Sequence, residues 1–120
     1  MNNANIIGRL TRDPELRQTP NGISVCTFSI AVTRKHNRDE ADFIPVVVWR
    51  EAAENANKYL KKGDQAAVSG NLRTRDYEGN DGKRRFVMEL VADNVEYLQK
   101  VKRKEDEPES EEPDPNKYRP

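Results

Sequence analysis

The segment "DFIPVVVWREAAENANKYLKKGDQAAVSGNLRTRDY", residues 42–77, decides the fold. It opens with an apolar run at 42–50, whose β-branched and aromatic residues predict a strand. Residues 51–62 carry good helix formers, with acids in the first turn, lysines in the last and a glycine just beyond. Residues 65–77 then alternate as a strand does. The segment therefore predicts a strand, a helix and a second strand, in that order.

Three further strands flank this segment. Residues 4–11 and 23–34 precede it, joined by a loop at 12–22 with two prolines and a tight Asn-Gly turn, and residues 84–98 follow it. Five strands with one helix between the third and the fourth is the chain order of an OB-fold, a small five-stranded Greek-key barrel. We therefore predict an all-β domain of this class.

The strand at 42–50 is apolar on both of its faces. Period two puts Ile44, Val46 and Val48 on one face, and Phe43, Pro45, Val47 and Trp49 on the other. An antiparallel strand over a single core needs only one apolar face. The second face is therefore either covered by another subunit or a platform for a ligand.

The last two strands form a hairpin rich in cations. Residues 65–77 place Arg73, Arg75 and Tyr77 on the face opposite the apolar positions, and the returning strand opens with Lys83, Arg84 and Arg85. Phe86 shares its face with Met88 and Leu90, so it belongs either to the core or to the cationic surface.

Charge is divided unequally along the chain, although 21 basic and 21 acidic residues cancel overall. Residues 105–120 hold 7 acids, 2 bases and no aliphatic residue, and such a segment cannot bury enough surface to order itself. Residues 1–104 keep 19 bases and 14 acids, a net charge of +5. We predict a basic domain at 1–104 with a disordered acidic tail at 105–120, an asymmetry that favours nucleic acid as a partner.

Enzymatic chemistry finds little support in the sequence. The one cysteine, Cys26, falls among the core positions of its strand, and the one histidine, His36, lies in a charged loop without a second metal ligand. No motif for an activated serine or a phosphate-binding glycine loop is present. We expect no catalysis, no cofactor and no metal. Because no apolar run approaches 18 residues, we also expect no membrane association and a cytoplasmic location.

Binding of single-stranded nucleic acid fits the pattern better. It requires cations that follow the phosphates and flat rings on which any base can stack. Phe43 and Trp49 on one strand and Arg73, Arg75 and Tyr77 on the next supply both. Other interpretations remain open: Trp49 could anchor an oligomer interface, the arginines could only solvate an edge, and the domain could be a protein-interaction subunit or could bind RNA.

Three stretches carry a resemblance to a known family: "IIGRLTRDPELRQTPNG" at 6–22, "VVVWREAAENANKYLKKGDQAAVSGNLRTRDY" at 46–77 and "GKRRFVMELVADNVEYL" at 82–98. The chain resembles the bacterial single-stranded DNA-binding proteins, which include phage-encoded members. The resemblance implies an OB-fold, usually in a homotetramer, that coats single-stranded DNA without sequence preference during replication, recombination or repair. It implies no catalysis and no metal.

The resemblance also implies a set of contact residues. Carried over position by position, stacking rings fall at Phe43, Trp49 and Tyr77, and a further aromatic position of the family falls at His36. Basic contacts fall at Arg34 or Lys35, Lys62, Arg73 and Arg75, to which the hairpin adds Lys83, Arg84 and Arg85. A position that is cationic in some relatives is occupied by Pro45.

The tail differs most from the family pattern. Relatives commonly end in an acidic run that closes on Asp-Ile-Pro-Phe and docks replication and repair proteins, whereas this chain ends "NKYRP". The resemblance implies the tail as a contact for such partners, and the changed end argues against that route. Alternatively, an acidic tail competes with DNA for the basic domain and keeps the protein in solution.

Overall fold

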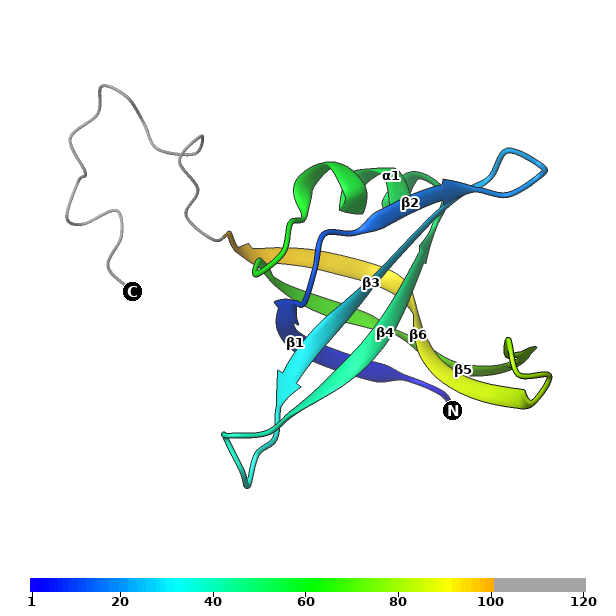
Figure 1. Ribbon diagram of the computed structural model, residues 1–120. Helices are drawn as coiled ribbons and strands as arrows, with labels where there is room; N and C mark the ends of the chain where they lie inside the picture. The colour runs from blue at the N-terminus through cyan, green and yellow to red at the C-terminus, as the bar shows by residue number, and fades with distance from the viewer. Residues whose placement is uncertain (101–120) are drawn as a thin grey trace.

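The computed structural model, described for residues 1–100, contains six strands and one helix (Figure 1). The elements are β1 (Ala4–Leu10), β2 (Glu15–Gln18), β3 (Ser24–Thr33), β4 (Ala41–Trp49), α1 (Arg50–Tyr59), β5 (Gln65–Glu78) and β6 (Arg84–Gln99). The helix therefore follows the predicted order, between the strands at 41–49 and 65–78.

Five of the strands close into a barrel. The sheet runs in the order β1-β5-β6-β4-β3, and β1 pairs again with β3, which completes the ring. All neighbours are antiparallel except β4 and β6, which pair in parallel at Val46–Leu90 and Val47–Val91. This closure confirms the predicted OB-fold, and it removes the open edges that a flat sheet would leave.

The sixth strand, β2, was predicted as part of a loop. Glu15–Gln18 pair with the first half of β3, where β1 leaves that edge free because β1 reaches β3 only at Ile30 and Ala31. All four residues of β2 are exposed, so they lack the alternation that marks a strand. The pairing is imposed by the neighbouring strand rather than by the local pattern.

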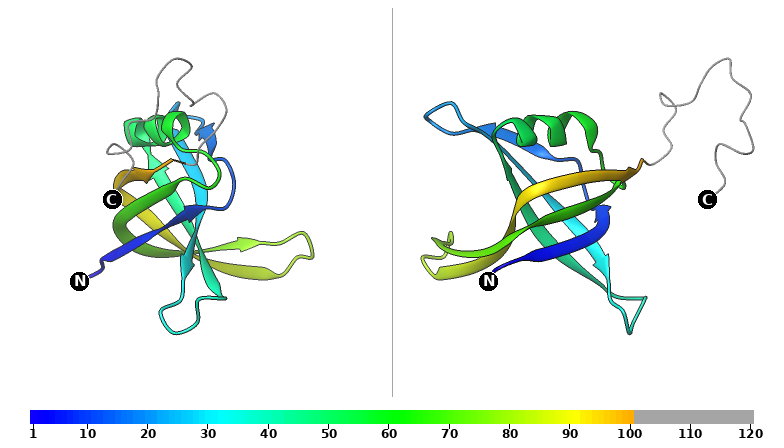
Figure 2. Two further views of the ribbon diagram at one scale, coloured as in Figure 1. Left: turned by 90° about the vertical axis from the view of Figure 1, so that its left-hand side faces the viewer. Right: turned by 180° about the vertical axis from the view of Figure 1, so that it is seen from behind.

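The core fills the barrel with the inward residues of each strand. Its larger members are Leu10, Phe28, Ile30, Leu60 and Leu90, with Val46, Val48 and Val68. Helix α1 lies across one end of the barrel (Figures 1 and 2) and buries Ala53 and Ala56 against it, and Leu60 follows directly after the helix. Ala52 and Tyr59 are exposed, because the inward face of the helix centres on Ala53 and Ala56.

The helix is shorter than predicted and ends at Tyr59 instead of residue 62. The chain turns there because the buried carboxylate of Asp64 accepts a hydrogen bond from the Lys61 backbone N–H (2.9 Å), while the Asp64 N–H donates to the Lys61 carbonyl (3.0 Å). Gly63 adopts φ +88° within this turn, a conformation that favours glycine. The turn delivers the chain into β5.

Gly70 allows two strands of the barrel to approach each other closely. A Cβ at Gly70 would lie 2.0 Å from the Val91 carbonyl oxygen, which is backbone and has no freedom to rotate away. Gly70 also stands at a β-bulge, where the register between β5 and β6 shifts. The missing side chain allows β5 to bend across β6 at this point.

Beyond Gly70 the two strands continue out of the barrel as a two-stranded arm, here called the β5–β6 arm (residues 71–90). Figures 1 and 2 show it projecting from the barrel on the side away from the helix. Of the predicted apolar face, only Leu90 is buried, while Phe86 is 77% and Met88 56% exposed. Phe86 is therefore not a core residue, because the arm has left the layer that would cover it.

Two predictions concern the C-terminal end of the chain. The boundary at residue 104 and the acidic tail at 105–120 lie outside the described residues. Within residues 1–100, no helix is long and apolar enough to cross a bilayer.

Candidate nucleic-acid interface

The outer face of β4 runs without interruption onto the β5–β6 arm. Val47 pairs in parallel with Val91 of β6, and Val91 lies opposite Asn71 of β5. Paired residues of neighbouring strands point to the same side of a sheet. Because residues two apart share a face, Phe43 and Trp49 on β4 join one surface with the odd-numbered residues of the arm.

Three rings stand on this surface. Phe43 is 66%, Tyr77 45% and Trp49 36% exposed, so each ring presents area to solvent. Phe43 and Trp49 lie six residues apart on β4, about 20 Å along an extended strand. Val47, which lies between them on the same face of β4, is buried, so the surface between the two rings is apolar. Exposed rings with an apolar surface between them provide stacking positions for bases.

Two arginines of the arm lie on the same face as Tyr77, and one of them contacts its ring. Arg73 and Arg75 extend from β5 on the same side, with about half of each side chain exposed. The guanidinium carbon of Arg75 lies 5.7 Å from the centroid of the Tyr77 ring. Both arginines contact Glu89 of β6, which lies directly opposite Arg73 in the ladder. The surface thus combines rings and cations at short range.

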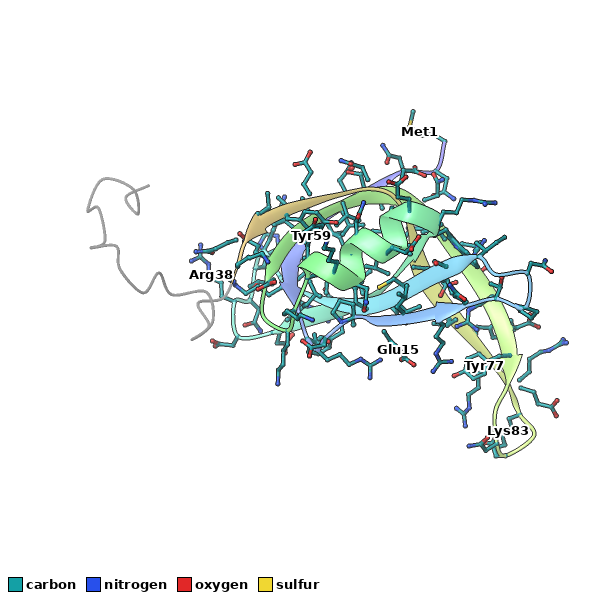
Figure 3. All side chains as sticks on the ribbon, turned by 90° about the horizontal axis from the view of Figure 1, so that it is seen from above. Met1, Glu15, Arg38, Tyr59, Tyr77 and Lys83 are labelled. Carbon is teal, nitrogen blue, oxygen red and sulfur yellow. The ribbon has the colours of Figure 1, made fainter. Side chains whose placement is uncertain are left out.

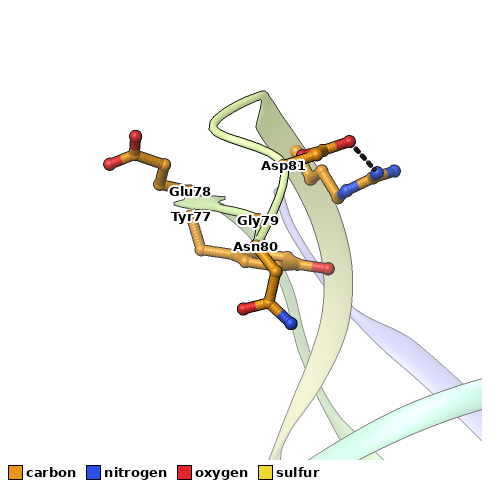
Figure 4. Close-up of a pocket in the computed structure, with 6 residues that line it drawn as sticks. Tyr77, Glu78, Gly79, Asn80 and Asp81 are labelled. Carbon is orange, nitrogen blue, oxygen red and sulfur yellow. Dashed lines mark hydrogen bonds and ion pairs between the residues drawn. The ribbon is translucent and has the colours of Figure 1, made fainter.

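The tip of the arm contains a small hollow. It is lined by Tyr77, Glu78, Gly79, Asn80, Asp81 and Arg85. Figure 4 shows the Tyr77 ring and the Asn80 side chain on the same side of the turn. Arg85 lies opposite Tyr77 in the register and its guanidinium is 2.8 Å from the Asp81 carboxylate. Arg85 therefore extends the cationic surface toward the tip.

The other two cations of the tip lie apart from this surface. Arg84 lies on the opposite face of the arm, with the even-numbered residues, and forms an ion pair with Asp76 at 2.9 Å. Lys83 lies in the turn, where its backbone N–H donates to the Asp81 carboxylate. Figure 3 shows Tyr77 and Lys83 at the far end of the arm, well away from the helix and Tyr59.

The loop between β3 and β4 carries Arg34, Lys35 and His36, all exposed. Arg34 is engaged by two acids of the same hairpin: its guanidinium donates to Asp42 at 2.9 and 3.1 Å and to Glu40 at 2.8 Å. The hydrogen bond with Asp42 and the charge of that carboxylate raise the pKa of Arg34. DNA would have to compete with these two exposed carboxylates for this cation.

Lys62 lies outside the paired strands that form the surface. It follows α1 in the connection to β5, and its backbone N–H donates to the Asp13 carboxylate at 2.8 Å. Within residues 1–100, no strand pairing joins this connection to β4. The structure therefore brings together Phe43, Trp49, Arg73, Arg75, Tyr77 and Arg85, and leaves Lys62 outside that group.

Glu89 is the residue of this surface that the sequence did not single out. It is 4% exposed, although it lies on the outer face of β6. The sequence could have indicated it, because Glu89 lies between Met88 and Leu90 and therefore points to the other face of the strand. With the hairpin turn at residues 79–82, that face is the one that carries the arginines.

Cys26, the one thiol of the chain, lies in the core with no exposed surface. Burial raises the pKa of this thiol to about 11, so that it stays protonated at neutral pH. Since nucleophilic attack requires the thiolate, Cys26 is a packing residue, as its place in the strand pattern predicted.

An OB-fold with rings and arginines on the outer face of its sheet has the construction of a single-strand nucleic-acid-binding domain. Comparison with known proteins defines the family: the model of the single-strand binding protein family matches residues 1–98. The chain belongs to this family.

Several bacterial proteins are similar in sequence over the same region. The chain is 53% identical over 103 residues to "Single-stranded DNA-binding protein 3" of Listeria innocua, a match that covers 82% of this chain and 64% of that protein. It is 52% identical to "Single-stranded DNA-binding protein" of Bacillus cereus, covering 61% of the relative, and 52% identical to "Single-stranded DNA-binding protein 2" of Staphylococcus aureus, covering 73%. The chain thus spans less than two thirds of the length of most of these relatives.

Proposed function

We propose that this protein binds single-stranded DNA without sequence preference and coats exposed strands during replication, recombination or repair. The observation that carries the proposal is the continuous outer surface of β4 and the β5–β6 arm, on which three exposed rings and three arginines lie together. Membership of the single-strand binding protein family and the names of the similar bacterial proteins support it.

In the proposed mode, bases stack on Phe43, Trp49 and Tyr77 while phosphates contact Arg73 and Arg75. Stacking contributes about 1 to 3 kcal/mol per base and tolerates any sequence, because every base has a flat face. Arg85, Lys83 and Arg84 at the tip of the arm, and Arg34 and Lys35 beyond β3, add charge at the margins, and His36 occupies a further ring position in the same loop. Lys62, in the connection between α1 and β5, remains a predicted contact.

The sole tryptophan gives a direct test. Titration with oligo-dT should quench the fluorescence of Trp49 at low salt, and a gel mobility shift should follow the same concentration dependence. The affinity should fall steeply as salt rises, because phosphate contacts release counterions. Neither quenching nor a mobility shift at low salt would refute the proposal.

Sequence tolerance and sugar choice need a competition experiment. Oligo-dT, oligo-dA and a mixed sequence should compete with one another within about tenfold, since stacking rather than base-edge hydrogen bonding would hold them. Oligo-U in the same assay separates DNA from RNA binding, because the two differ at the 2′-hydroxyl. Stronger binding of oligo-U would reassign the substrate to RNA.

We further propose that the protein acts as a homo-oligomer, a tetramer by analogy with the family. Several large apolar side chains are exposed, among them Leu72, Phe86 and Met88 on one face of the arm, and Ile7 on β1. Such exposure is typical of surfaces covered by protein. Light scattering with and without oligo-dT of increasing length reports assembly and stoichiometry together, and a monomer at all concentrations would refute this part.

A second candidate function is that of a protein-interaction subunit, with the outer apolar face of β4, which carries Phe43 and Trp49, buried against a partner protein. This alternative predicts a fixed protein partner and no binding of single-stranded or duplex DNA. Replication and repair proteins could also dock on the acidic tail, which a variant ending at residue 104 would test by pull-down. We propose a binding protein without catalysis, acting in the cytoplasm.

A further inference from the structure

Glu89 is a buried acid within a surface that otherwise carries positive charge. Its outer-face position on β6 is flanked by Val87 and Val91, and only 4% of the residue is exposed. A buried carboxylate is costly unless charged partners compensate it. The partners of Glu89 are Arg73 and Arg75, the two cations proposed to hold phosphate.

The contacts leave the outer ends of both arginines open. Arg75 uses Nε, 3.3 Å from Oε1 and 3.4 Å from Oε2 of Glu89, and Arg73 approaches Oε1 with Nη2 at 3.7 Å. The side chains of Arg73 and Arg75 are 54% and 56% exposed, whereas that of Glu89 is 5% exposed. A phosphate can thus approach both guanidinium groups from solvent while the carboxylate stays behind them.

Burial distinguishes Glu89 from the other acids that pair with arginines near the surface. Asp42 and Glu40, the partners of Arg34, have half-exposed side chains and can rotate into water when a phosphate arrives. Glu89 cannot leave without opening the surface between its neighbouring strands. Its negative charge therefore remains in place when DNA binds.

We propose that Glu89 is a fixed counter-charge of the DNA interface, which holds Arg73 and Arg75 side by side and opposes the phosphate that they bind. The three side chains then act toward DNA as one positive charge instead of two. This inference rests on the proposed function. Its consequence is weaker, more readily reversed binding than two free arginines would give.

The test counts charges through the salt dependence of oligo-dT binding, whose slope changes by about 0.7 for each phosphate neutralised on a single strand. The cluster carries +1 in the unaltered protein, +2 in Glu89→Gln, 0 in Arg73→Gln and again +1 in the double variant. We expect a slope steeper by about 0.7 in Glu89→Gln, shallower by about 0.7 in Arg73→Gln, and unchanged in the double variant.

Affinity gives a second readout. Glu89→Gln should bind oligo-dT roughly three- to tenfold more tightly at low salt. Coulomb's law gives this effect for removing a negative charge about 6 to 7 Å from a phosphate at an effective dielectric constant of about 40 to 80. Gln retains an oxygen that accepts from arginine, so the arginines stay oriented. A residue that only stabilised the fold would change the melting temperature and leave the slope alone.

Glu96→Gln is the matched control. It removes the same charge from the same strand, but Glu96 is exposed and lies opposite Ala67 in the barrel, outside the arm that carries Arg73 and Arg75. Its slope should match that of the unaltered protein. An equal steepening in Glu96→Gln and Glu89→Gln would show a general charge effect and overturn the inference.

The outcomes separate the two proposals. Absence of binding by the unaltered protein refutes the proposed function itself. Binding by the unaltered protein, with an unchanged or shallower slope or weaker affinity in Glu89→Gln, refutes only the counter-charge. If Glu89→Gln fails to fold, the double variant decides: a slope as shallow as that of Arg73→Gln overturns the inference, and a return to the original slope upholds it.

Discussion

Replacing Tyr77 by alanine should weaken binding of oligo-dT without unfolding the domain. The ring is 45% exposed on the β5–β6 arm, outside the buried core, so its removal creates no cavity. One stacked base is worth about 1 to 3 kcal/mol, which corresponds to a loss of affinity of about 5- to 150-fold. The contact with the Arg75 guanidinium at 5.7 Å adds to this loss, because the ring also helps to hold that cation.

Fluorescence of Trp49 measures the effect directly, since Tyr77→Ala leaves the tryptophan in place. Tyr77→Phe keeps the ring and should bind within about twofold of the unaltered protein, because a base stacks on either ring. Tyr97 supplies a matched control: it is 43% exposed but packs against Tyr59 of the helix, with ring centroids 5.9 Å apart. Tyr97→Ala should leave the affinity for DNA unchanged.

Two results would contradict this reasoning. An affinity of Tyr77→Ala within twofold of the original would show that the ring does not stack on a base. An equal loss in Tyr77→Ala and Tyr97→Ala would point to a general disturbance of the domain. Thermal melting of each variant separates that disturbance from a local loss, because Tyr77→Ala should retain the original melting temperature to within a few degrees.

Three further predictions concern stability. Gly70→Ala should lower the free energy of unfolding, measured in urea, by about 1 to 3 kcal/mol, because its Cβ would meet the Val91 carbonyl at 2.0 Å. Gly79→Ala should cost less, since its Cβ meets flexible side chains, and equal costs for the two variants would refute the argument from close packing at Gly70. Cys26 should react with a thiol reagent only upon unfolding, and rapid labelling of the folded protein would refute its burial. Because the folded thiol keeps its proton up to about pH 11, whereas the unfolded thiol loses it near pH 9, the free energy of unfolding should fall as pH rises from about 9 to 11. Arg50→Gly should raise the melting temperature, because Arg50 has φ +64°, a left-handed conformation that costs about 1 kcal/mol for a residue with a Cβ and that glycine adopts freely. A lower melting temperature of this variant would contradict the prediction.

Much of the fold followed from local patterns. The apolar run at 42–50, the helix formers after it and the alternation at 65–77 predicted the element order, and the barrel confirmed it. The pattern failed for β2, whose exposed residues gain their strand conformation only from the edge of β3. It left Phe86 open between core and surface and could not show that Met88 is exposed, because an alternating pattern reports a shared face and not whether another layer covers that face.

For the candidate site, the sequence determined which rings and cations are available and which side of their own strand each one occupies. Only the tertiary structure decided that the two strands share one surface, through the parallel pairing of Val47 with Val91, a contact between segments more than 40 residues apart. It also decided that Glu89 lies buried behind Arg73 and Arg75. Burial and pairing across distant strands depend on how the barrel closes, and no local pattern records that closure.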